Sequence, residues 1–149
     1  FLNSIDNLNQ IDVEKMINKN PLSVKGTYTV YQLLRFIKKE SKTVMVKFTG
    51  SDWCPPCKMI QKAVFDKKEF SEGVKDKFIL CIIDLPQGNK ELSNKNKPSL
   101  QKYKVQGFPT VLLLDSDGKE FTRYNPAAYP TVKGMIQQMN YQLRRKNML

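Results

Sequence analysis

Two cysteines separated by two residues form the part of the sequence whose spacing most clearly suits chemistry. Cys54 and Cys57 lie in the segment Trp53-Cys54-Pro55-Pro56-Cys57-Lys58. Thiols at this spacing can close a small disulfide ring and reopen it by exchange with another disulfide. If the pair opens a helix, the unpaired N–H groups and the positive end of the helix dipole favour the thiolate of the first cysteine, which is the attacking species. The pattern therefore predicts a redox pair in which Cys54 is exposed and reactive and Cys57 is more buried.

Two other interpretations of a Cys-x-x-Cys pair are a zinc site and a purely structural disulfide. A structural zinc site needs four ligands, but the chain contains three cysteines and no histidine. We therefore predict neither a metal nor another cofactor. A structural disulfide stays an alternative, although it would not need the preceding Trp53. The third cysteine, Cys81, lies in an apolar run and is predicted to be a buried, small apolar residue.

The composition predicts one globular domain with a basic surface. The 149 residues are 40% hydrophobic and carry a net charge of +11, which is enough apolar material for a core. The basic residues are scattered, without the aromatic residues that accompany them in RNA-binding motifs, so no nucleic-acid partner is predicted. No apolar run is long enough to cross a membrane. We expect a monomer.

The spacing of apolar residues predicts alternating helices and strands. Asn20-Pro21 indicates a break after a first segment, and Asp115–Gly118 a hairpin turn. Alternation followed by a hairpin predicts an α/β fold with a mixed sheet and helices on both of its faces. Helices are predicted within 8–17, over 29–40, from Pro55 to Val64 with a break near Asp66 and a continuation toward Val74, over 99–103 after a loop at 85–98, and from 130 onward. Strands are predicted over 44–48, 78–84, 111–114 and 120–124.

The active segment resembles that of the thioredoxin superfamily. The run Phe48–Cys54 is similar to bacterial extracytoplasmic reductases of this superfamily, akin to the C-terminal domain of DsbD. The segment Gly107-Phe108-Pro109-Thr110, followed by an apolar strand, looks like the superfamily's cis-proline segment. The resemblance spans roughly residues 30 to 145 and implies a thioredoxin fold. We place the thioredoxin-like domain over 25–149, with 1–24 as a short N-terminal extension.

Membership of this superfamily would also assign roles to the site residues. It implies that Cys54 attacks the substrate disulfide and that Cys57 resolves the mixed disulfide. It implies a cis bond before Pro109, which faces the disulfide, and backbone groups of Phe108 offered to an extended substrate peptide. The residues expected to contact substrate are Trp53, Pro55, Pro56, Phe108 and Pro109.

One position departs from the superfamily's pattern. A buried acid usually lies on the strand beneath the disulfide and accepts the proton of the resolving thiol. Here Lys47 occupies that part of the strand. Proton transfer from Cys57 is therefore assigned to Lys47, to Asp52 or to water.

The predicted function is reduction of protein disulfides, with protein substrates and a redox partner protein. The alternatives are a disulfide oxidase or isomerase, and a non-catalytic module that binds peptides. The expected location is the bacterial periplasm or another extracytoplasmic compartment, after removal of an upstream signal peptide, since the chain begins at Phe1. Because Pro55 and Pro56 have no N–H, Cys57 is the nearest main-chain donor to the sulfur of Cys54. We therefore expect only a modest lowering of the pKa of Cys54 and a reducing potential.

Overall fold

The fold is built on a mixed five-stranded sheet with helices on both faces, as the sequence predicts. The computed structural model describes residues 24–25 and 42–148. The strand order is β1-β3-β2-β4-β5; β3 runs parallel to β1 and β2, whereas β4 is antiparallel to both β2 and β5. The predicted helices within 8–17 and over 29–40 lie outside the described residues. The strands are β1 (Val24–Lys25), β2 (Thr43–Thr49), β3 (Phe78–Asp84), β4 (Thr110–Leu114) and β5 (Glu120–Tyr124).

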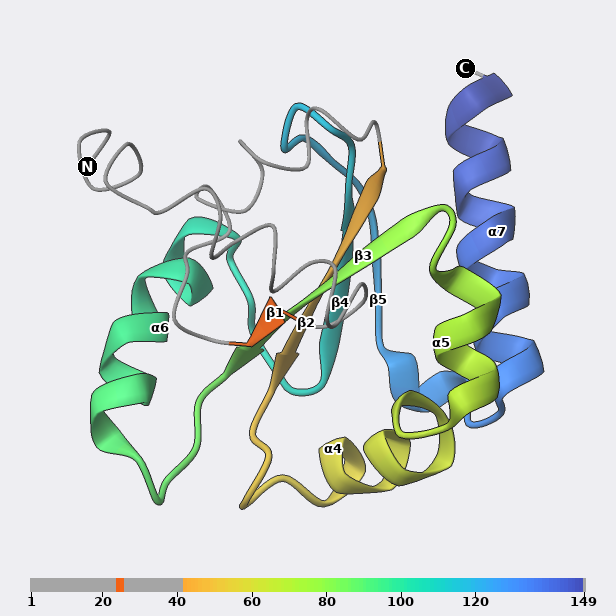
Figure 1. Cartoon of the computed structure of the whole chain (residues 1–149). Coiled ribbons are helices and arrows are strands. Elements are labelled where there is room, and N and C mark those ends of the chain that lie inside the picture. Colours follow the sequence, from red (N-terminus) through yellow and green to blue (C-terminus); the bar gives the residue numbers. More distant parts are fainter. Residues whose placement is uncertain (1–23, 26–41, 149) are drawn as a thin grey trace, which may run out of the picture.

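The helices divide between the two faces of the sheet. Figure 1 shows α6 on one face and α4, α5 and α7 on the other. The central strand β2 is buried along its whole length, and its side chains alternate between two apolar clusters. Val44, Val46 and Phe48 belong to the cluster under α6, while Met45 belongs to the cluster under the other helices. The helical segments are α4 (Pro55–Ile60), the π-helix η1 (Gln61–Phe65), α5 (Lys68–Val74), α6 (Lys90–Lys102), the 3₁₀ helix η2 (Pro126–Ala128) and α7 (Val132–Met148).

Helix α6 begins earlier than the sequence predicts. The loop predicted over 85–98 is wrong beyond Asn89, because α6 starts at Lys90 and contains Pro98. The side chain of Asn89 caps the helix by accepting the N–H of Leu92 at 3.1 Å. Asn96 is the buried residue of α6, and its amide donates to the main-chain oxygen of Asp84 at 2.7 Å. Leu100 of α6 also packs against the apolar cluster, but the polar Asn96 at the buried position interrupts the apolar periodicity on which the prediction depended.

The break predicted near Asp66 is confirmed, but the helical segment before it has an unpredicted form. The main-chain N–H of Asp66 donates to the carbonyl oxygen of Gln61 at 2.8 Å, a bond that spans five residues. This spacing is that of a π-helix, which is rare and often found at functional sites. Segment η1 therefore changes the direction in which side chains leave the helix after α4.

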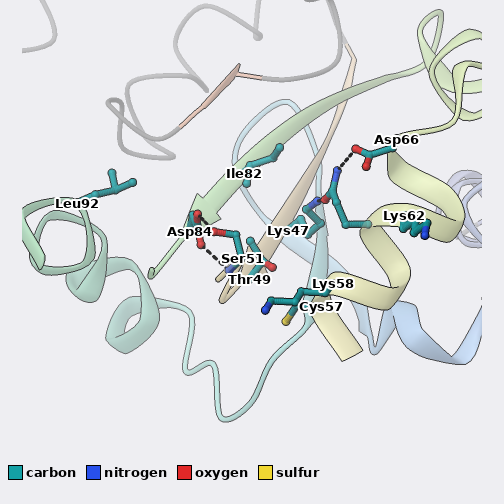
Figure 2. A pocket seen from close by; sticks show the side chains of 11 residues that line it. Lys47, Thr49, Ser51, Cys57, Lys58, Lys62, Asp66, Ile82, Asp84 and Leu92 are labelled. Carbon is teal, nitrogen blue, oxygen red and sulfur yellow. Dashed lines mark hydrogen bonds between the residues drawn. The ribbon is translucent and has the colours of Figure 1, made fainter. Parts of the chain in front are cut away.

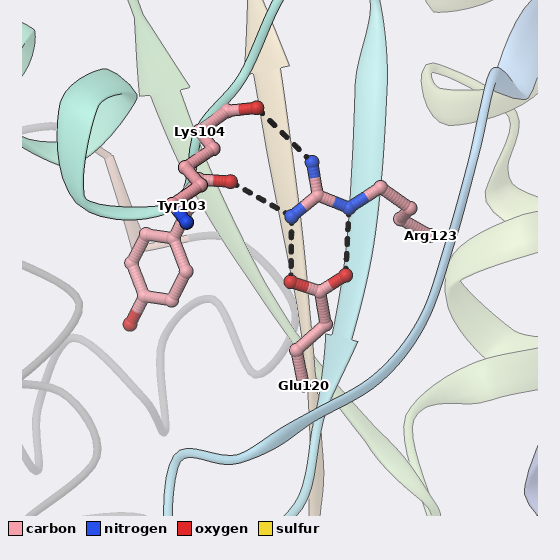
Figure 3. Close-up of polar contacts among 4 residues, drawn as sticks. All are labelled: Tyr103, Lys104, Glu120 and Arg123. Carbon is pink, nitrogen blue, oxygen red and sulfur yellow. Dashed lines mark hydrogen bonds and ion pairs between the residues drawn. The ribbon is translucent and has the colours of Figure 1, made fainter.

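Arg123 ties the edge strand β5 to the end of α6 (Figure 3). Its guanidinium donates to the main-chain oxygens of Tyr103 at 2.7 Å and Lys104 at 3.2 Å, and to both carboxylate oxygens of Glu120. Lys104 has a φ of 51°, in the left-handed region that often ends a helix. The guanidinium of Arg123 therefore stabilises the turn in which the chain leaves α6 and continues toward Phe108.

Candidate active site

Cys54 and Cys57 form a disulfide at the beginning of α4. Their Cα atoms are 5.2 Å apart. Cys54 is the capping residue, Pro55 and Pro56 fill the first helical positions, and the sulfur of Cys54 accepts the N–H of Cys57 at 3.3 Å. The prediction that Cys57 is the nearest main-chain donor is confirmed. The prolines suit these positions because the N–H groups of the first turn have no partner within the helix.

The prediction that Cys54 is the exposed member of the pair is wrong for the disulfide-bonded protein. Cys54 is 3% exposed and Cys57 2% exposed. The bonded sulfurs occlude part of each other's surface, so the two residues are equally covered. The two prolines between them are exposed. An incoming thiol therefore meets the prolines and the neighbouring Trp53 first.

Trp53 lies at the junction of three segments. Its indole N–H donates to the main-chain oxygen of Leu85 at 2.8 Å, and its ring meets that of Phe108 edge to face, with centroids 5.5 Å apart. A Cβ at Gly50 would lie 2.3–2.6 Å from atoms of the indole, so only glycine fits there. Trp53 remains 37% exposed, so its ring is also available to a ligand.

The segment before β4 meets the disulfide segment through that aromatic contact. The Phe108–Pro109 peptide bond is cis. Pro109 is buried, and Phe108 is half-buried against the cluster under α6. The structure thus brings Phe108 together with Trp53 from distant parts of the sequence. The hydroxyl of Thr110 donates to the carbonyl oxygen of Gly107 at 2.7 Å, which closes the turn around Pro109.

A cavity of about 650 Å³ lies behind Cys57 (Figure 2). Lys47 and Thr49 of β2 line it, together with Ile82 and Asp84 of the neighbouring strand. The parallel register pairs Lys47 with Ile82 and Thr49 with Asp84, so these four residues share one face of the sheet. The remaining lining residues are Ser51, Cys57, Lys58, Gln61, Lys62, Asp66 and Leu92.

Lys47 is only 2% exposed and is among the largest fully buried side chains. Its ammonium donates to the amide oxygen of Gln61 and lies 4.1 Å from the ring centroid of Phe65. Burial of an ammonium is unfavourable unless polar or aromatic groups compensate for the lost water. Gln61 and Phe65, the first and last residues of η1, provide this compensation.

Asp52 holds a loop on the exposed side of the site. Its two carboxylate oxygens accept the N–H groups of Gln87 at 2.9 Å and Gly88 at 2.7 Å. These hydrogen bonds lower the pKa of Asp52 below its ordinary value. Asp52 thus connects the active segment to the loop before α6, whereas Lys47 shares the cavity with Cys57.

Three residues that line the cavity were not predicted from the sequence, namely Asp84, Gln61 and Asp66. Asp84 accepts the N–H of Ser51 at 3.0 Å and its hydroxyl at 2.5 Å. Asp84 is an acid at the end of a buried strand, and this position in the sequence could have indicated that it lies near the loop before Trp53. No pattern in the sequence marked Gln61 and Asp66, because a π-helix brings them toward Lys47.

Cys81 lies on β3 and is completely buried. Its burial raises the pKa of the thiol to about 12. It packs in the cluster under α6, on the opposite face from Lys47.

Among the described residues, no group of three or more His, Cys, Asp or Glu side chains lies close enough to hold a metal ion. No helix in the part of the chain that the structure describes is long and apolar enough to cross a membrane.

Curated proteins with similar sequences include several that are named for disulfide chemistry. The disulfide bond reductase DsbH of Chlamydia pneumoniae is 33% identical over 95 residues, which are 62% of this chain and 57% of that protein. The thiol:disulfide interchange protein DsbD of Photorhabdus laumondii is 38% identical over 80 residues, which are 53% of this chain and 13% of that protein. The chain thus spans little more than half, or much less, of these curated relatives.

Solved structures with a similar fold include proteins of the same DsbH and DsbD kind. A DsbH oxidoreductase superimposes with a TM-score of 0.69 and 25% identity, over 84% of this chain and 89% of that chain. The oxidised C-terminal domain of Neisseria meningitidis DsbD shares the fold, with a TM-score of 0.56 and 18% identity over 75% of this chain and 90% of that domain.

The sequence model of the family described as thioredoxin-like domain matches residues 31–142, more than half of the chain. The match includes both the Cys54–Cys57 segment and the Phe108–Pro109 segment. The mixed sheet and the disulfide at the beginning of α4 agree with it. The chain therefore belongs to the thioredoxin-like family, among relatives of the DsbH and DsbD kind.

Proposed function

We propose that this protein is a thiol–disulfide oxidoreductase that reduces protein disulfides with the Cys54–Cys57 pair. The observation that carries the proposal is the disulfide at the beginning of α4, where Cys54 caps the helix and accepts the N–H of Cys57. A sulfur in this position is favoured as a thiolate by the helix terminus. Relatives named as a disulfide bond reductase and a thiol:disulfide interchange protein support the same chemistry.

The cycle starts from the reduced pair. The thiolate of Cys54 attacks one sulfur of the substrate disulfide, and the other substrate sulfur leaves as a thiolate and takes a proton from water. Cys57 then loses its proton and attacks the sulfur of Cys54, which releases the second substrate thiol. Two electrons pass to the substrate, and the protein is left with the Cys54–Cys57 disulfide. A redox partner protein must reduce that disulfide again.

We infer the reducing direction from the small number of groups that stabilise the Cys54 thiolate. Strongly oxidising members of this superfamily stabilise the thiolate heavily, which raises the reduction potential. Here Pro55 and Pro56 cannot donate, and the chain has no histidine. The helix terminus and Lys58 still favour the thiolate. We therefore expect a potential of about −270 mV, that of thioredoxin, and not the value of about −120 mV of a strong oxidant.

The residues around the disulfide suit an extended peptide substrate. We assign contact with substrate to the exposed residues Trp53, Pro55 and Pro56, together with Phe108 and Pro109 on the facing segment. To assist the loss of the proton from Cys57 to water, we favour the charge of Lys47 over the carboxylate of Asp52. Lys47 lines the cavity behind Cys57, whereas both oxygens of Asp52 already accept main-chain N–H groups.

We also propose an extracytoplasmic, bacterial setting and a monomeric protein without a cofactor. The bacterial origin of the DsbH and DsbD relatives supports the bacterial setting. The thioredoxin-like domain is proposed to comprise 25–149, with 1–24 as an extension. An export signal in the complete gene product would support this setting.

An insulin-reduction assay tests the proposal. The wild-type protein should reduce insulin, Cys54→Ser should be inactive, and Cys57→Ser should accumulate mixed disulfides. Retention of activity by Cys54→Ser would contradict the assigned roles. Equilibration with glutathione gives the potential, and a value above about −180 mV, that of protein disulfide isomerase, would replace the reductase by an oxidase or isomerase. Peptide binding without reduction would indicate a non-catalytic module.

A further inference from the structure

The cavity behind Cys57 contains a chain of hydrogen bonds that leads from a buried cation to the surface. The ammonium of Lys47 donates to the amide oxygen of Gln61, and the amide nitrogen of Gln61 donates to the carboxylate of Asp66 at 2.7 Å. Lys47 is buried, Gln61 is half-buried and Asp66 is exposed. Figure 2 shows Lys47, Cys57 and Asp66 around the same cavity.

The backbone of η1 makes this arrangement possible. Gln61 opens the π-helix, and its carbonyl oxygen accepts the N–H of Asp66 while its side chain donates to the carboxylate of the same residue. Gln61 is thus held at two points by Asp66. Its amide oxygen then has a fixed direction, toward Lys47. Phe65 at the end of η1 covers the ammonium from another side.

The charge held in this way lines the same cavity as the thiol that must ionise in the second half of the cycle. Cys57 is almost fully buried, and burial disfavours a thiolate. A nearby cation has the opposite effect, and its influence is stronger in a poorly hydrated interior than in water. An ammonium has no lone pair, so it cannot accept the thiol proton itself. It can act only through its charge, and the proton leaves to water in the cavity.

The inference rests on the proposed function and deepens it. We propose that Gln61 and Asp66 are positioning residues, which hold the Lys47 ammonium at the cavity wall so that its charge promotes ionisation of Cys57 during resolution of the mixed disulfide. In that step the proton of Cys57 passes to water, the Cys57 thiolate bonds to the sulfur of Cys54, and the substrate sulfur leaves with the electron pair of the broken bond.

Other charged groups line the same cavity and contribute to its field. Lys58 and Lys62 are exposed, and Asp84 of β3 is half-buried and bonded to Ser51. The exposed lysines are screened by solvent, so each should influence Cys57 less than the buried ammonium. Asp84 opposes Lys47 in sign, and its hydrogen bonds to Ser51 are independent of Gln61. Substitution of Gln61 therefore changes the position of the Lys47 charge without direct loss of any charge.

The first test measures the pKa of Cys57 without using catalysis. In a Cys54→Ala, Cys81→Ala background, ultraviolet absorbance of the thiolate follows Cys57 alone. Gln61→Leu should raise the titration midpoint by about one pH unit, at the lower end of the shift that a nearby opposite charge produces. Asp66→Ala should raise the midpoint relative to Asp66→Asn, which loses the same negative charge. Asp66→Asn, which keeps an acceptor for Gln61, should lie close to the parent. Gln137→Leu, an exposed change on α7, is the matched control and should not shift it.

A double-mutant cycle identifies Lys47 as the group through which Gln61 acts. Lys47→Met alone should raise the Cys57 midpoint, and Gln61→Leu should add nothing in that background. Midpoints unchanged by both Gln61→Leu and Asp66→Ala would overturn the inference, and so would an equal effect of Gln61→Leu with and without Lys47. If Gln61→Leu does not fold, the comparison of Asp66→Ala with Asp66→Asn, at an exposed position, provides the test.

Single-turnover kinetics connect the titration to the reaction. Reduced protein mixed with an excess of a disulfide peptide should show a concentration-dependent phase for attack and a concentration-independent phase for resolution. At pH 7 the second phase should slow about tenfold in Gln61→Leu, while the first changes less than about twofold. Absence of both phases in the wild-type protein would contradict the proposed reductase function but leave the titration result standing. An unchanged second phase beside an active first phase would contradict the inference alone.

Discussion

The indole N–H of Trp53 donates to the carbonyl oxygen of Leu85 at 2.8 Å. Leu85 follows the end of β3, so this bond fixes the segment that carries the disulfide to the loop leading into α6. Asp52 makes the neighbouring connection, to Gln87 and Gly88. The exposed side of the active site is therefore a pair of loops held together by three hydrogen bonds. Its geometry should be sensitive to changes remote from sulfur.

Gly50→Ala should displace Trp53. The added Cβ would lie as close as 2.3 Å to the indole, well inside van der Waals contact, so the ring must leave Leu85 and Phe108. We expect a loss of about 1–3 kcal/mol of stability and a several-fold fall in insulin reduction. Trp53 is the only tryptophan of the chain, so its fluorescence reports the displacement directly.

The matched control for this change is Gly107→Ala. A Cβ at Gly107 would have no heavy atom within 4 Å, so the emission of Trp53 should stay at its wild-type wavelength. Equal emission spectra for Gly50→Ala and the wild-type protein would contradict the packing described for the indole.

The sheet and the redox pair were predictable because both depend on local patterns. The apolar runs of β2, β3 and β4 mark buried strands, and Cys-Pro-Pro-Cys marks a helix start with two thiols. The first part of α6 was not predicted in this way, because its buried position is the polar Asn96, whose amide contacts the end of β3. The same reason hid Gln61, whose relation to Lys47 exists only once η1 packs on the sheet. Polar contacts between distant segments leave no periodic signal.

Arg123→Lys should loosen the junction between α6 and β5. A lysine ammonium cannot reproduce the planar fork that reaches Tyr103, Lys104 and Glu120 at once. Because the site is partly exposed, we expect a loss of only about 1 kcal/mol, measured by urea unfolding. Glu120→Gln should have a smaller effect, since the two main-chain contacts of Arg123 remain. Arg144→Lys, an exposed change on α7, serves as the control, and a loss of equal size there would argue against a special role for the fork.

Asp52→Asn should change how stability depends on pH. The N–H groups of Gln87 and Gly88 lower the pKa of the Asp52 carboxylate in the folded protein. The stabilisation is therefore fully present above the unfolded pKa of about 3.9 and is lost as the pH falls through the lower, folded value. The wild-type protein should be more stable than Asp52→Asn at pH 7, and the difference should shrink below about pH 4. Urea midpoints at several pH values measure this difference.

The control for Asp52 is Asp76→Asn, at an exposed position shortly before β3. It tests whether any loss of a negative charge from this basic protein has the same effect. A pH-dependent difference of the same size in Asp76→Asn would show that net charge, and not the bonds to Gln87 and Gly88, is responsible.

Cys81 should not react with thiol reagents in the folded protein. Its side chain is completely buried, and burial raises the pKa of its thiol to about 12, so almost no thiolate is present at pH 8. With Cys54 and Cys57 joined, the oxidised protein should show no rapidly reacting thiol with a chromogenic disulfide reagent. Addition of denaturant should reveal one thiol per chain, and Cys81→Ala should reveal none. Rapid reaction of one thiol in the native, oxidised wild-type protein would mean that β3 opens readily or that the Cys54–Cys57 disulfide is incomplete. Mass spectrometry of the labelled peptide distinguishes these two cases.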